Sequence, residues 1–375
     1  MRIAVVGSGY NGIANAALLS RNAEVKIVRT QKPDFYGCDK DFDSFCSADS
    51  VKAMLSDDSA INDADLVVIT LPVSYDSDLN HCDTMEVEKY IALSMTKAKN
   101  ADIVLRSDVP IGFTERINSR TNRKVLCFPD FSREGRAVYD TLNPTRLVIS
   151  GDIDKAEKIA ALFKGNNTDV PVFVTGSSEA ESVKLFTNSY LAMRVAFFNE
   201  LDTFAQTRGF CSADIIRCIS MDPRVGDLYN NPSFAFGGKY LVEDSRKLKQ
   251  NFRDIPEKII SMVTESNETR LDFIASEIIS KGVETVGIYR MGMKTGSKDF
   301  SYSASSGLLR RLGAAGLKVI IYEPQIEIDR FMSAKVLNDF EAFKAQCGLI
   351  VANRLTPDLA DVSDKVYSRD LFLRD

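Results

Sequence analysis

The sequence has few of the features that several common classes of protein require. Its 375 residues include one histidine, His81, so Ser-His or Cys-His catalysis would depend on that single side chain. The context "DLNHCDT" favours an exposed loop instead. No apolar run approaches the roughly 20 residues that a membrane-spanning helix needs. Glycines interrupt the short apolar run at the N-terminus, so we do not expect a signal peptide.

An excess of positive charge is also absent. The formal net charge is −5, which argues against nucleic acid or an anionic membrane as a partner. The cysteines are odd in number and scattered, without the spacing of metal ligands. We therefore expect a cytoplasmic protein with free thiols and no metal site. The seven cysteines are Cys38, Cys46, Cys82, Cys127, Cys211, Cys218 and Cys347.

A glycine motif opens the chain. In "RIAVVGSGYNGIANAALLSR" an apolar strand leads through a glycine turn into a helix, and Gly7, Gly9 and Gly12 form G-x-G-x-x-G. Gly7 permits the tight turn, Gly9 lets a pyrophosphate approach the backbone, and Gly12 lets the helix pack on the strand. A second strand, "AEVKIV", follows at the expected distance. The motif predicts a dinucleotide-binding domain.

The end of that second strand departs from the usual NAD pattern. An acidic residue for the ribose hydroxyls is expected roughly 20 residues past the glycines, but Arg29 and Thr30 stand there. Arg29 could pair with a 2′-phosphate and favour NADP. It could equally be a solvated charge at a site that no longer needs a cofactor, and the sequence leaves both interpretations open.

The rest of the chain is predicted to form strands and helices both before and after a long helix. Buried strands are predicted at 64–72, 101–110 and 124–130, and a long helix begins near residue 177. New strands follow in "VETVGIYRMGMK", "LKVIIYEP" and "QCGLIVANR". We predict an α/β protein with two Rossmann-like parallel-sheet domains joined by a long central helix. The expected domains are a dinucleotide-binding domain at 1–175, a central helical dimerisation domain at 176–270 and a C-terminal α/β domain at 271–375.

Longer motifs carry a resemblance to a known family. Residues 128–151 and 179–248, with "GSGYNG" and "VGIYRMGMK", closely resemble UDP-glucose 6-dehydrogenases of the UDP-glucose/GDP-mannose dehydrogenase family. The resemblance covers nearly the whole chain in order. It implies that the long helix is the core of a homodimer and that the C-terminal domain binds a UDP-sugar. The family reaction is two successive NAD-dependent oxidations of a sugar C6 alcohol, through an aldehyde, to a uronic acid.

Several of the family's reaction-centre positions are changed. The catalytic loop "GGYCLPKD" of the family reads "GGKYLVED" here, so Tyr240 stands at the cysteine and Asp244 is kept. Asp108 replaces a threonine that helps to hold the catalytic water. Asp130 shortens a glutamate, and Val73 replaces the polar residue that ends "ATPT".

The sugar-nucleotide positions are kept. Lys184 and Asn188 match the residues that flank the reacting carbon, residues 229–234 ("YNNPSF") match the loop over the uridine diphosphate, and Arg224 matches an arginine that reaches the partner subunit's site. By resemblance, the catalytic positions are Tyr240, Lys184, Asn188, Asp244, Glu134 and Asp108. The cofactor-binding positions are Gly7, Gly9, Tyr10, Asn11, Gly12, Arg29, Pro72 and Asp108. The substrate-binding positions are Phe131, Arg133, Glu134, Lys184, Asn188, Arg224, Tyr229, Asn230, Ser233, Gly237 and Lys294.

Tyr240 determines which chemistry we expect. The family's thioester route needs a thiolate, and a phenol with a pKa of about 10 is poorly suited to replace it. We therefore expect the second oxidation to be lost or slow. The first oxidation needs only a base and a hydride acceptor, and Tyr240 near Lys184 could act as that base.

Three hypotheses follow. The chain is an NAD- or NADP-dependent nucleotide-sugar oxidoreductase that stops at the carbonyl, or a nucleotide-sugar-binding paralogue without turnover. The third is an ordinary UDP-glucose 6-dehydrogenase whose loop is misaligned here. The third is the weakest, because the glycines and Asp244 fix the alignment of the loop on both sides.

Overall fold

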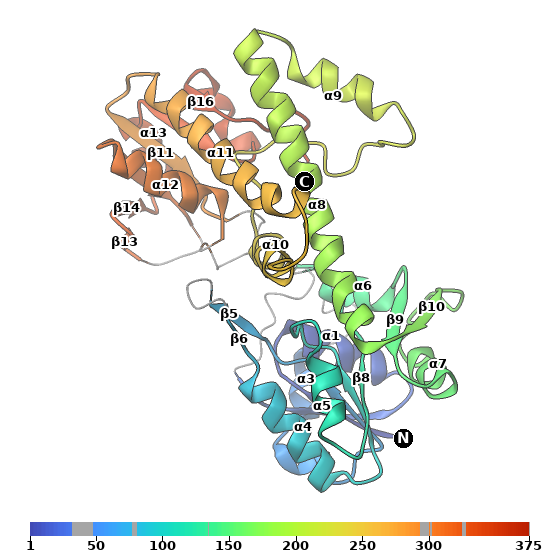
Figure 1. The fold of residues 1–375 in the computed structure, drawn as a ribbon. Coiled ribbons are helices and arrows are strands. Elements are labelled where there is room, and N and C mark those ends of the chain that lie inside the picture. The colour runs from blue at the N-terminus through green and yellow to red at the C-terminus, as the bar shows by residue number, and fades with distance from the viewer. Residues whose placement is uncertain are drawn as a thin grey trace. The chain divides into compact units, whose positions relative to one another are not determined.

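The computed structural model describes residues 1–31, 48–76, 81–133, 135–292, 300, 302–324 and 328–374. The chain divides into two compact units, Met1–Leu185 and Phe186–Asp375, and each is treated by itself. Both units combine a sheet with covering helices (Figure 1). Among the described residues, no helix is long and apolar enough to cross a membrane.

A six-stranded parallel sheet forms the centre of the N-terminal unit, in the order β3-β2-β1-β4-β7-β8. Counted along the chain, this is the strand order 3-2-1-4-5-6 of a dinucleotide-binding fold. The strands are β1 (Arg2–Val6), β2 (Glu24–Val28), β3 (Leu55–Ser56), β4 (Leu66–Ile69), β7 (Asp102–Leu105) and β8 (Val125–Cys127).

Both faces of this sheet are buried, which explains why its strands are apolar throughout rather than alternating. Along β1, Ile3 and Val5 belong to one hydrophobic cluster, and Ala4 and Val6 belong to another on the opposite face. The unit's helices are α1 (Tyr10–Leu19), α3 (Ala48–Met54), α4 (Met85–Lys97), α5 (Phe113–Ser119), α6 (Ala137–Leu142), α7 (Ile153–Ala161) and the 3-10 turn η1 (Asp58–Ile61). A hairpin joins β5 (Ser74–Asp76) to β6 (His81–Asp83), and β9 (Leu147–Ser150) pairs in parallel with β10 (Val172–Thr175).

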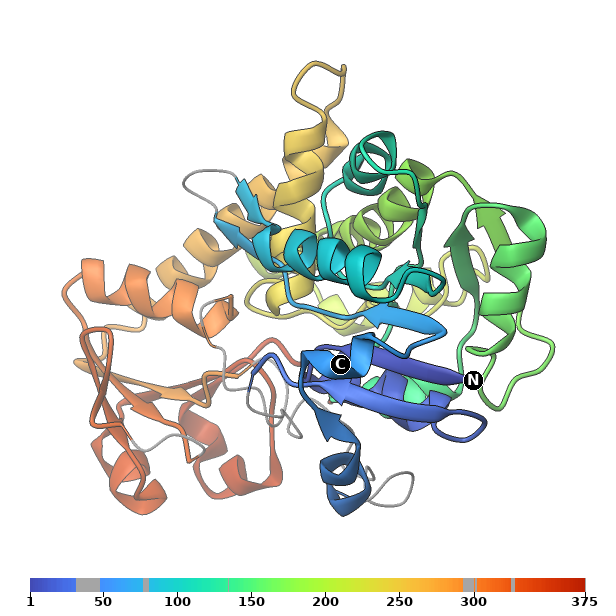
Figure 2. The ribbon, with the colours of Figure 1, turned by 90° about the horizontal axis from the view of Figure 1, so that it is seen from below.

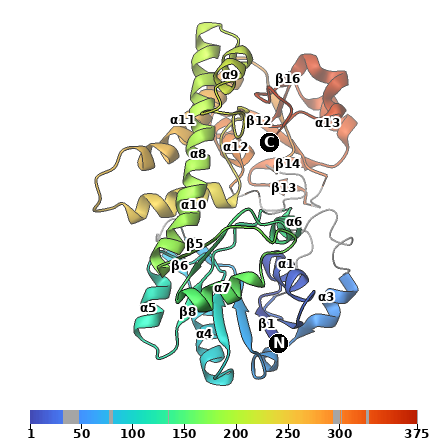
Figure 3. The ribbon, with the colours of Figure 1, turned by 90° about the vertical axis from the view of Figure 1, so that its right-hand side faces the viewer.

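A single helix of 32 residues, α8 (Ser177–Arg208), follows and is drawn in green in Figure 3. It begins in the N-terminal unit and continues in the C-terminal unit. Three further helices come next in the chain. They are α9 (Ser212–Ser220), α10 (Lys239–Asn251) and α11 (Ile259–Ile279). The long helix predicted from residue 177 onward is therefore confirmed.

A second six-stranded sheet lies in the C-terminal unit, in the order β13-β14-β12-β11-β15-β16 (orange and red in Figure 2). All neighbours are parallel except β13 and β14. The strands are β11 (Thr285–Tyr289), β12 (Lys318–Tyr322), β13 (Arg330–Phe331), β14 (Ala334–Leu337), β15 (Leu349–Ala352) and β16 (Val366–Tyr367). The helices beside them are α12 (Ala304–Ala314), α13 (Phe340–Gln346) and the 3-10 segment η2 (Pro357–Lys365).

The predicted fold class, with two Rossmann-like sheets and a long central helix, is confirmed. The predicted division into three domains at 175 and 270 stays a prediction.

Candidate active site

The glycine turn after β1 leaves no room for side chains. Gly7 has φ +125°, and a Cβ there would lie 2.6 Å from Thr70 Oγ1. A Cβ on Gly12 would lie 2.0 Å from the Gly7 carbonyl oxygen. Helix α1 begins at Tyr10, and Gly9 before it supplies no side-chain cap. The N-terminal end of a helix favours an anion, so this glycine turn fits a dinucleotide pyrophosphate.

Arg29 and Gln31 lie just beyond the end of β2. The Arg29 side chain is exposed, and its backbone N–H donates to Ser56 O at 3.0 Å. Ser8 Oγ donates to Gln31 O at 2.6 Å, and a Cβ on Gly9 would lie 3.1 Å from Gln31 Nε2. A neutral amide thus stands beside the glycine turn. Sequence reasoning missed Gln31, although its position two residues past Arg29 could have drawn attention to it.

Asn11 and Asp130 link helix α1 to the segment after β8. Ser132 Oγ donates to Asn11 Oδ1 at 3.1 Å, and Asn15 Nδ2 donates to Asp130 Oδ2 at 3.0 Å. Arg106 Nη2 lies 3.1 Å from the same carboxylate oxygen. Burial raises the pKa of Asp130, but the Arg106 guanidinium and the Lys184 ammonium outweigh burial and hold that pKa well below its usual range. Asp130 is therefore a buried, ionised carboxylate.

Lys184 and Asp108, both predicted to be catalytic, are in contact. Lys184 Nζ lies 2.6 Å from Asp108 Oδ1, with the two side chains 11% and 24% exposed. Asp108 follows β7, where the carboxyl ends of parallel strands form the usual ligand edge. The structure therefore places the Asp108 carboxylate directly on Lys184.

Cys127 is the last residue of β8 and is buried. Burial, and after it the carboxylate of Glu181, raises the pKa of the Cys127 thiol well above its usual value. Burial also raises the pKa of Glu181, although that side chain accepts hydrogen bonds from Gly112 N (2.6 Å) and Thr114 N (2.8 Å). Cys127 therefore stays a thiol and is no substitute for a catalytic thiolate.

The predicted catalytic loop leads into α10 in the C-terminal unit. Gly238 precedes the helix with φ +86°, which favours glycine, and Tyr240 is the second helical residue and half-buried. Asn188 Nδ2 donates to Asp244 Oδ2 at 2.6 Å, so two predicted catalytic residues meet here. Lys247 Nζ lies 3.7 Å from Asp244 Oδ1 and 3.4 Å from the buried Glu243 carboxylate. Lys247 was not predicted.

The predicted nucleotide-sugar loop, residues 229–234, lies in the same unit. Tyr229 has φ +55° and is 37% exposed. A non-glycine residue in this region is strained and is kept there only by its surroundings, which is common at ligand sites. Asn230 and Ser233 are buried, each 2% exposed. Gly237, three residues beyond the loop, is half-buried.

The remaining predicted residues are more dispersed. Arg224 pairs with Asp222 at 2.6 Å and its side chain is 88% exposed. Arg133 pairs with Asp140 at 2.7 Å, and the Phe131 ring lies 4.3 Å from the Arg146 guanidinium carbon. Pro72 is exposed and Tyr10 half-buried.

Three predicted placements stay open. Glu134 and Lys294 lie outside the described residues. Lys184 belongs to the N-terminal unit and Tyr240 to the C-terminal unit, so their predicted proximity stays a prediction. Arg290, four residues before Lys294 in the sequence, is a candidate binding residue that was not predicted. It follows β11 with φ +61°, and its guanidinium lies 3.6 Å from the Asp358 carboxylate.

Comparison with protein families gives two matches along the chain. Residues 1–165 match the model described as "UDP-glucose/GDP-mannose dehydrogenase family, NAD binding domain". Residues 178–269 match the model of the central domain of the same family.

Individual relatives agree over the full length. The chain is 39% identical to a UDP-glucose 6-dehydrogenase of Streptococcus pneumoniae over 394 residues, and 39% identical to one of Campylobacter jejuni over 392 residues, with 100% of each chain covered. Among solved structures, a UDP-glucose dehydrogenase of Pyrobaculum islandicum superposes with a TM-score of 0.85 at 20% identity, covering 99% of this chain and 94% of the other. This structural likeness shows the fold.

Proposed function

The chain belongs to the UDP-glucose/GDP-mannose dehydrogenase family, and from this we propose that it oxidises the C6 alcohol of a UDP-sugar and stops at the carbonyl. It is UDP-glucose 6-dehydrogenase-like and carries the NAD-binding domain of this oxidoreductase family. The names of the relatives make UDP-glucose the first substrate to try. A bound nicotinamide dinucleotide would accept the hydride from the sugar carbon.

The observation that carries this proposal is the residue in the first turn of α10. By the resemblance, Tyr240 stands where the family motif has its nucleophilic cysteine, two residues after the glycine pair Gly237 and Gly238. A phenol does not form the thiohemiacetal and thioester that the aldehyde oxidation uses. Within the described part of the chain, no cysteine lies on α10. The second oxidation therefore has no evident nucleophile.

The first oxidation keeps the groups that it needs. The alcohol proton must pass to a base while the carbon loses its hydride. Two residues are candidates for that base, Tyr240 and the Asp108 carboxylate. The Lys184 ammonium, 2.6 Å from Asp108, can stabilise the alkoxide that forms as the proton leaves. Asn188, held by Asp244 at 2.6 Å, can orient the sugar.

One observation favours the alternative of a nucleotide-sugar-binding protein without turnover. The contact of Lys184 with Asp108 engages the lysine that would otherwise serve the reacting oxygen. With Arg29 in place of the usual ribose-binding acid, a protein that binds the sugar nucleotide but no dinucleotide is the second candidate.

Hydride stoichiometry separates these functions. Purified protein with UDP-glucose and either NAD or NADP is followed at 340 nm, with hydrazine present to trap a carbonyl product. The proposal expects one reduced dinucleotide per UDP-glucose and a trapped hydrazone. Binding of UDP-glucose without reduction supports the binding protein, and two reduced dinucleotides per sugar would overturn both.

The proposed partner is a second copy of the chain. Four aromatic side chains on α8 are between 46% and 58% exposed in the single chain. Their spacing of four, seven and seven residues places them on one face of the helix. They are Phe186, Tyr190, Phe197 and Phe204. Burial of this aromatic face against its copy would form the expected homodimer.

A further inference from the structure

The backbone of the nucleotide-sugar loop is fixed by side chains rather than by a sheet or helix. Four side chains from distant parts of the sequence satisfy its polar groups. The bonds are Ser233 N–H to Asn199 Oδ1 (2.9 Å), Phe234 N–H to Asn353 Oδ1 (3.0 Å), Arg354 Nη1 to Pro232 O (3.0 Å) and Arg270 Nε to Ser233 O (3.1 Å). The conformation of the loop therefore depends on each of the elements that supply these bonds.

The C-terminal segment, residues 369–374, makes the densest set of such bonds. Asn231 is 5% exposed. Its Nδ2 donates to Asp370 Oδ1 at 2.7 Å and also to the Arg374 carbonyl, and its Oδ1 accepts from the N–H groups of Leu371 (3.0 Å) and Phe372 (3.2 Å). Both donor hydrogens and both lone pairs of this amide are thus used by one segment.

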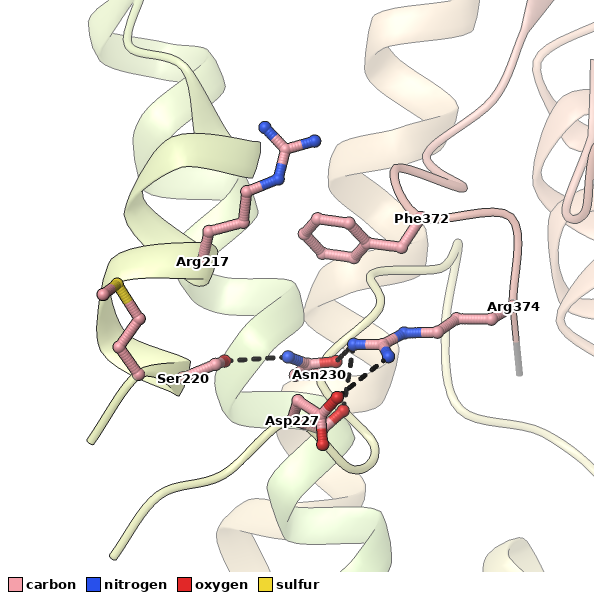
Figure 4. A pocket seen from close by; sticks show the side chains of 7 residues that line it. Arg217, Ser220, Asp227, Asn230, Phe372 and Arg374 are labelled. Atoms are coloured by element: carbon pink, nitrogen blue, oxygen red, sulfur yellow. Dashed lines mark hydrogen bonds and ion pairs between the residues drawn. The ribbon is translucent and has the colours of Figure 1, made fainter. Parts of the chain in front are cut away.

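The Arg374 side chain makes a second connection. Its guanidinium donates to Asn230 Oδ1 at 2.9 Å, to Asp227 O at 3.0 Å and to Asp227 Oδ2 at 3.1 Å. Asn230 Nδ2 in turn donates to Ser220 Oγ at 2.8 Å on α9. Figure 4 shows this chain of contacts from Ser220 through Asn230 to Arg374 and Asp227.

The end of the segment is not part of the hydrophobic core. A cavity of about 560 Å³ lies beside it, lined by Phe372 and Arg374 from the segment and by Arg217 and Met221 from α9 and its C-cap, among others (Figure 4). The neighbouring Leu373 is 71% exposed. Substitution of the exposed Arg374 should therefore leave the packed core intact.

We propose that the C-terminal segment is a positioning element for the nucleotide-sugar loop, so that affinity for the sugar nucleotide depends on Arg374 and Asp370 acting through Asn230 and Asn231. This inference rests on the proposed function, since that assigns the loop to the sugar nucleotide. Tyr229, held in the left-handed region at φ +55°, would relax once the bonds to its neighbours are removed.

The test compares Arg374→Ala and Asp370→Ala with the unchanged protein. UDP-glucose and dinucleotide dissociation constants are measured by calorimetry, and hydrogen exchange is followed at the amides of Ser233 and Phe234. We expect the UDP-glucose dissociation constant to rise about tenfold or more, because several hydrogen bonds to charged groups are lost. Exchange at the loop amides should accelerate, and dinucleotide affinity should stay unchanged, since the glycine turn lies in the other unit.

Asp272→Ala is the matched control. It also removes a carboxylate from the C-terminal unit, but one that pairs with Arg311 on the surface and is 69% exposed. It should change neither loop exchange nor UDP-glucose affinity. Arg374→Lys separates positioning from direct ligand contact, since a lysine keeps the charge but cannot bridge Asn230 and Asp227 in the same way.

The outcomes are distinguishable. Failure of the unchanged protein to bind UDP-glucose would remove the proposed function, while loop exchange would still decide the positioning role. Unaltered loop exchange in both alanine variants would overturn this inference whatever the affinities. Full affinity in Arg374→Lys together with weak affinity in Arg374→Ala would also overturn it, because the charge would then be acting directly on the ligand.

Discussion

Tyr240 and Asp108 are the two candidates for the base in the first oxidation, and substitution of Tyr240 distinguishes between them. If the hydroxyl is the base, Tyr240→Phe should slow hydride transfer by about 10² to 10⁴-fold and leave UDP-glucose affinity nearly unchanged. If Asp108 is the base instead, Tyr240→Phe should be almost silent. Single-turnover reduction of the dinucleotide at 340 nm measures the rate.

Asp108→Asn and Asp108→Thr complete this comparison. Both remove the carboxylate from Lys184, and the threonine also restores the family residue. Loss of hydride transfer in both Asp108 variants, with normal rates in Tyr240→Phe, would assign the base to Asp108. Normal rates in all three variants would contradict the involvement of either residue.

Arg29 makes a prediction about the cofactor. If its exposed guanidinium pairs with a 2′-phosphate, NADP should bind at least about tenfold more tightly than NAD, which corresponds to roughly 1.4 kcal/mol. Arg29→Asp should then reverse the preference. Titration of both dinucleotides by calorimetry measures it, with Arg21→Asp as a control at a basic residue that precedes the start of β2 instead of following its end. Equal affinities would remove the NADP interpretation.

Asp130 predicts a dependence of stability on pH. Its pKa is lowered in the folded chain, because Arg106 and Lys184 outweigh burial. A carboxyl with a lowered folded pKa stabilises the fold above its unfolded pKa of about 3.9 and loses that contribution as the pH falls. The unfolding free energy of the unchanged protein should therefore fall as the pH is lowered from about 5 to roughly one to two units below the unfolded pKa. Asp130→Asn should make this fall shallower. Urea unfolding over that range measures it, and an unchanged acid slope would contradict the prediction.

The aromatic face of helix α8 leads to a prediction about the assembly of the chain. Phe197→Glu should dissociate the proposed homodimer, because it places a charge within an aromatic face that would be buried between two copies. Sedimentation velocity at micromolar concentration measures the assembly state. Phe173→Glu is the matched control, since Phe173 is 66% exposed and lies on strand β10, not on α8. A monomeric unchanged protein would refute the proposed dimer.

Features that depend on neighbouring residues could be predicted from the sequence. The glycine turn and α8 arise from local rules, namely tight backbone approach at Gly7 and Gly12 and continuous helical periodicity from Ser177. The contact of Asp108 with Lys184 joins residues 76 positions apart, and that of Asn15 with Asp130 joins residues 115 positions apart. Neither contact is implied by periodicity or spacing. The resemblance named Asp108 and Lys184 separately, but only the folded chain brings them together.

At the scale of the whole molecule, the two ligands should protect different parts of the chain. All proposed dinucleotide contacts, from Gly7 to Asp108, lie in the N-terminal unit. The proposed UDP-sugar contacts include Lys184 and Phe131 in that unit and the nucleotide-sugar loop in the other. A ligand at 100 times its dissociation constant stabilises the part it binds by about 2.7 kcal/mol. A dinucleotide alone should therefore slow hydrogen exchange around the glycine turn and leave the nucleotide-sugar loop unaffected. UDP-glucose alone should slow exchange in both units. Protection of the nucleotide-sugar loop by a dinucleotide alone would contradict the assignment of all dinucleotide contacts to the N-terminal unit.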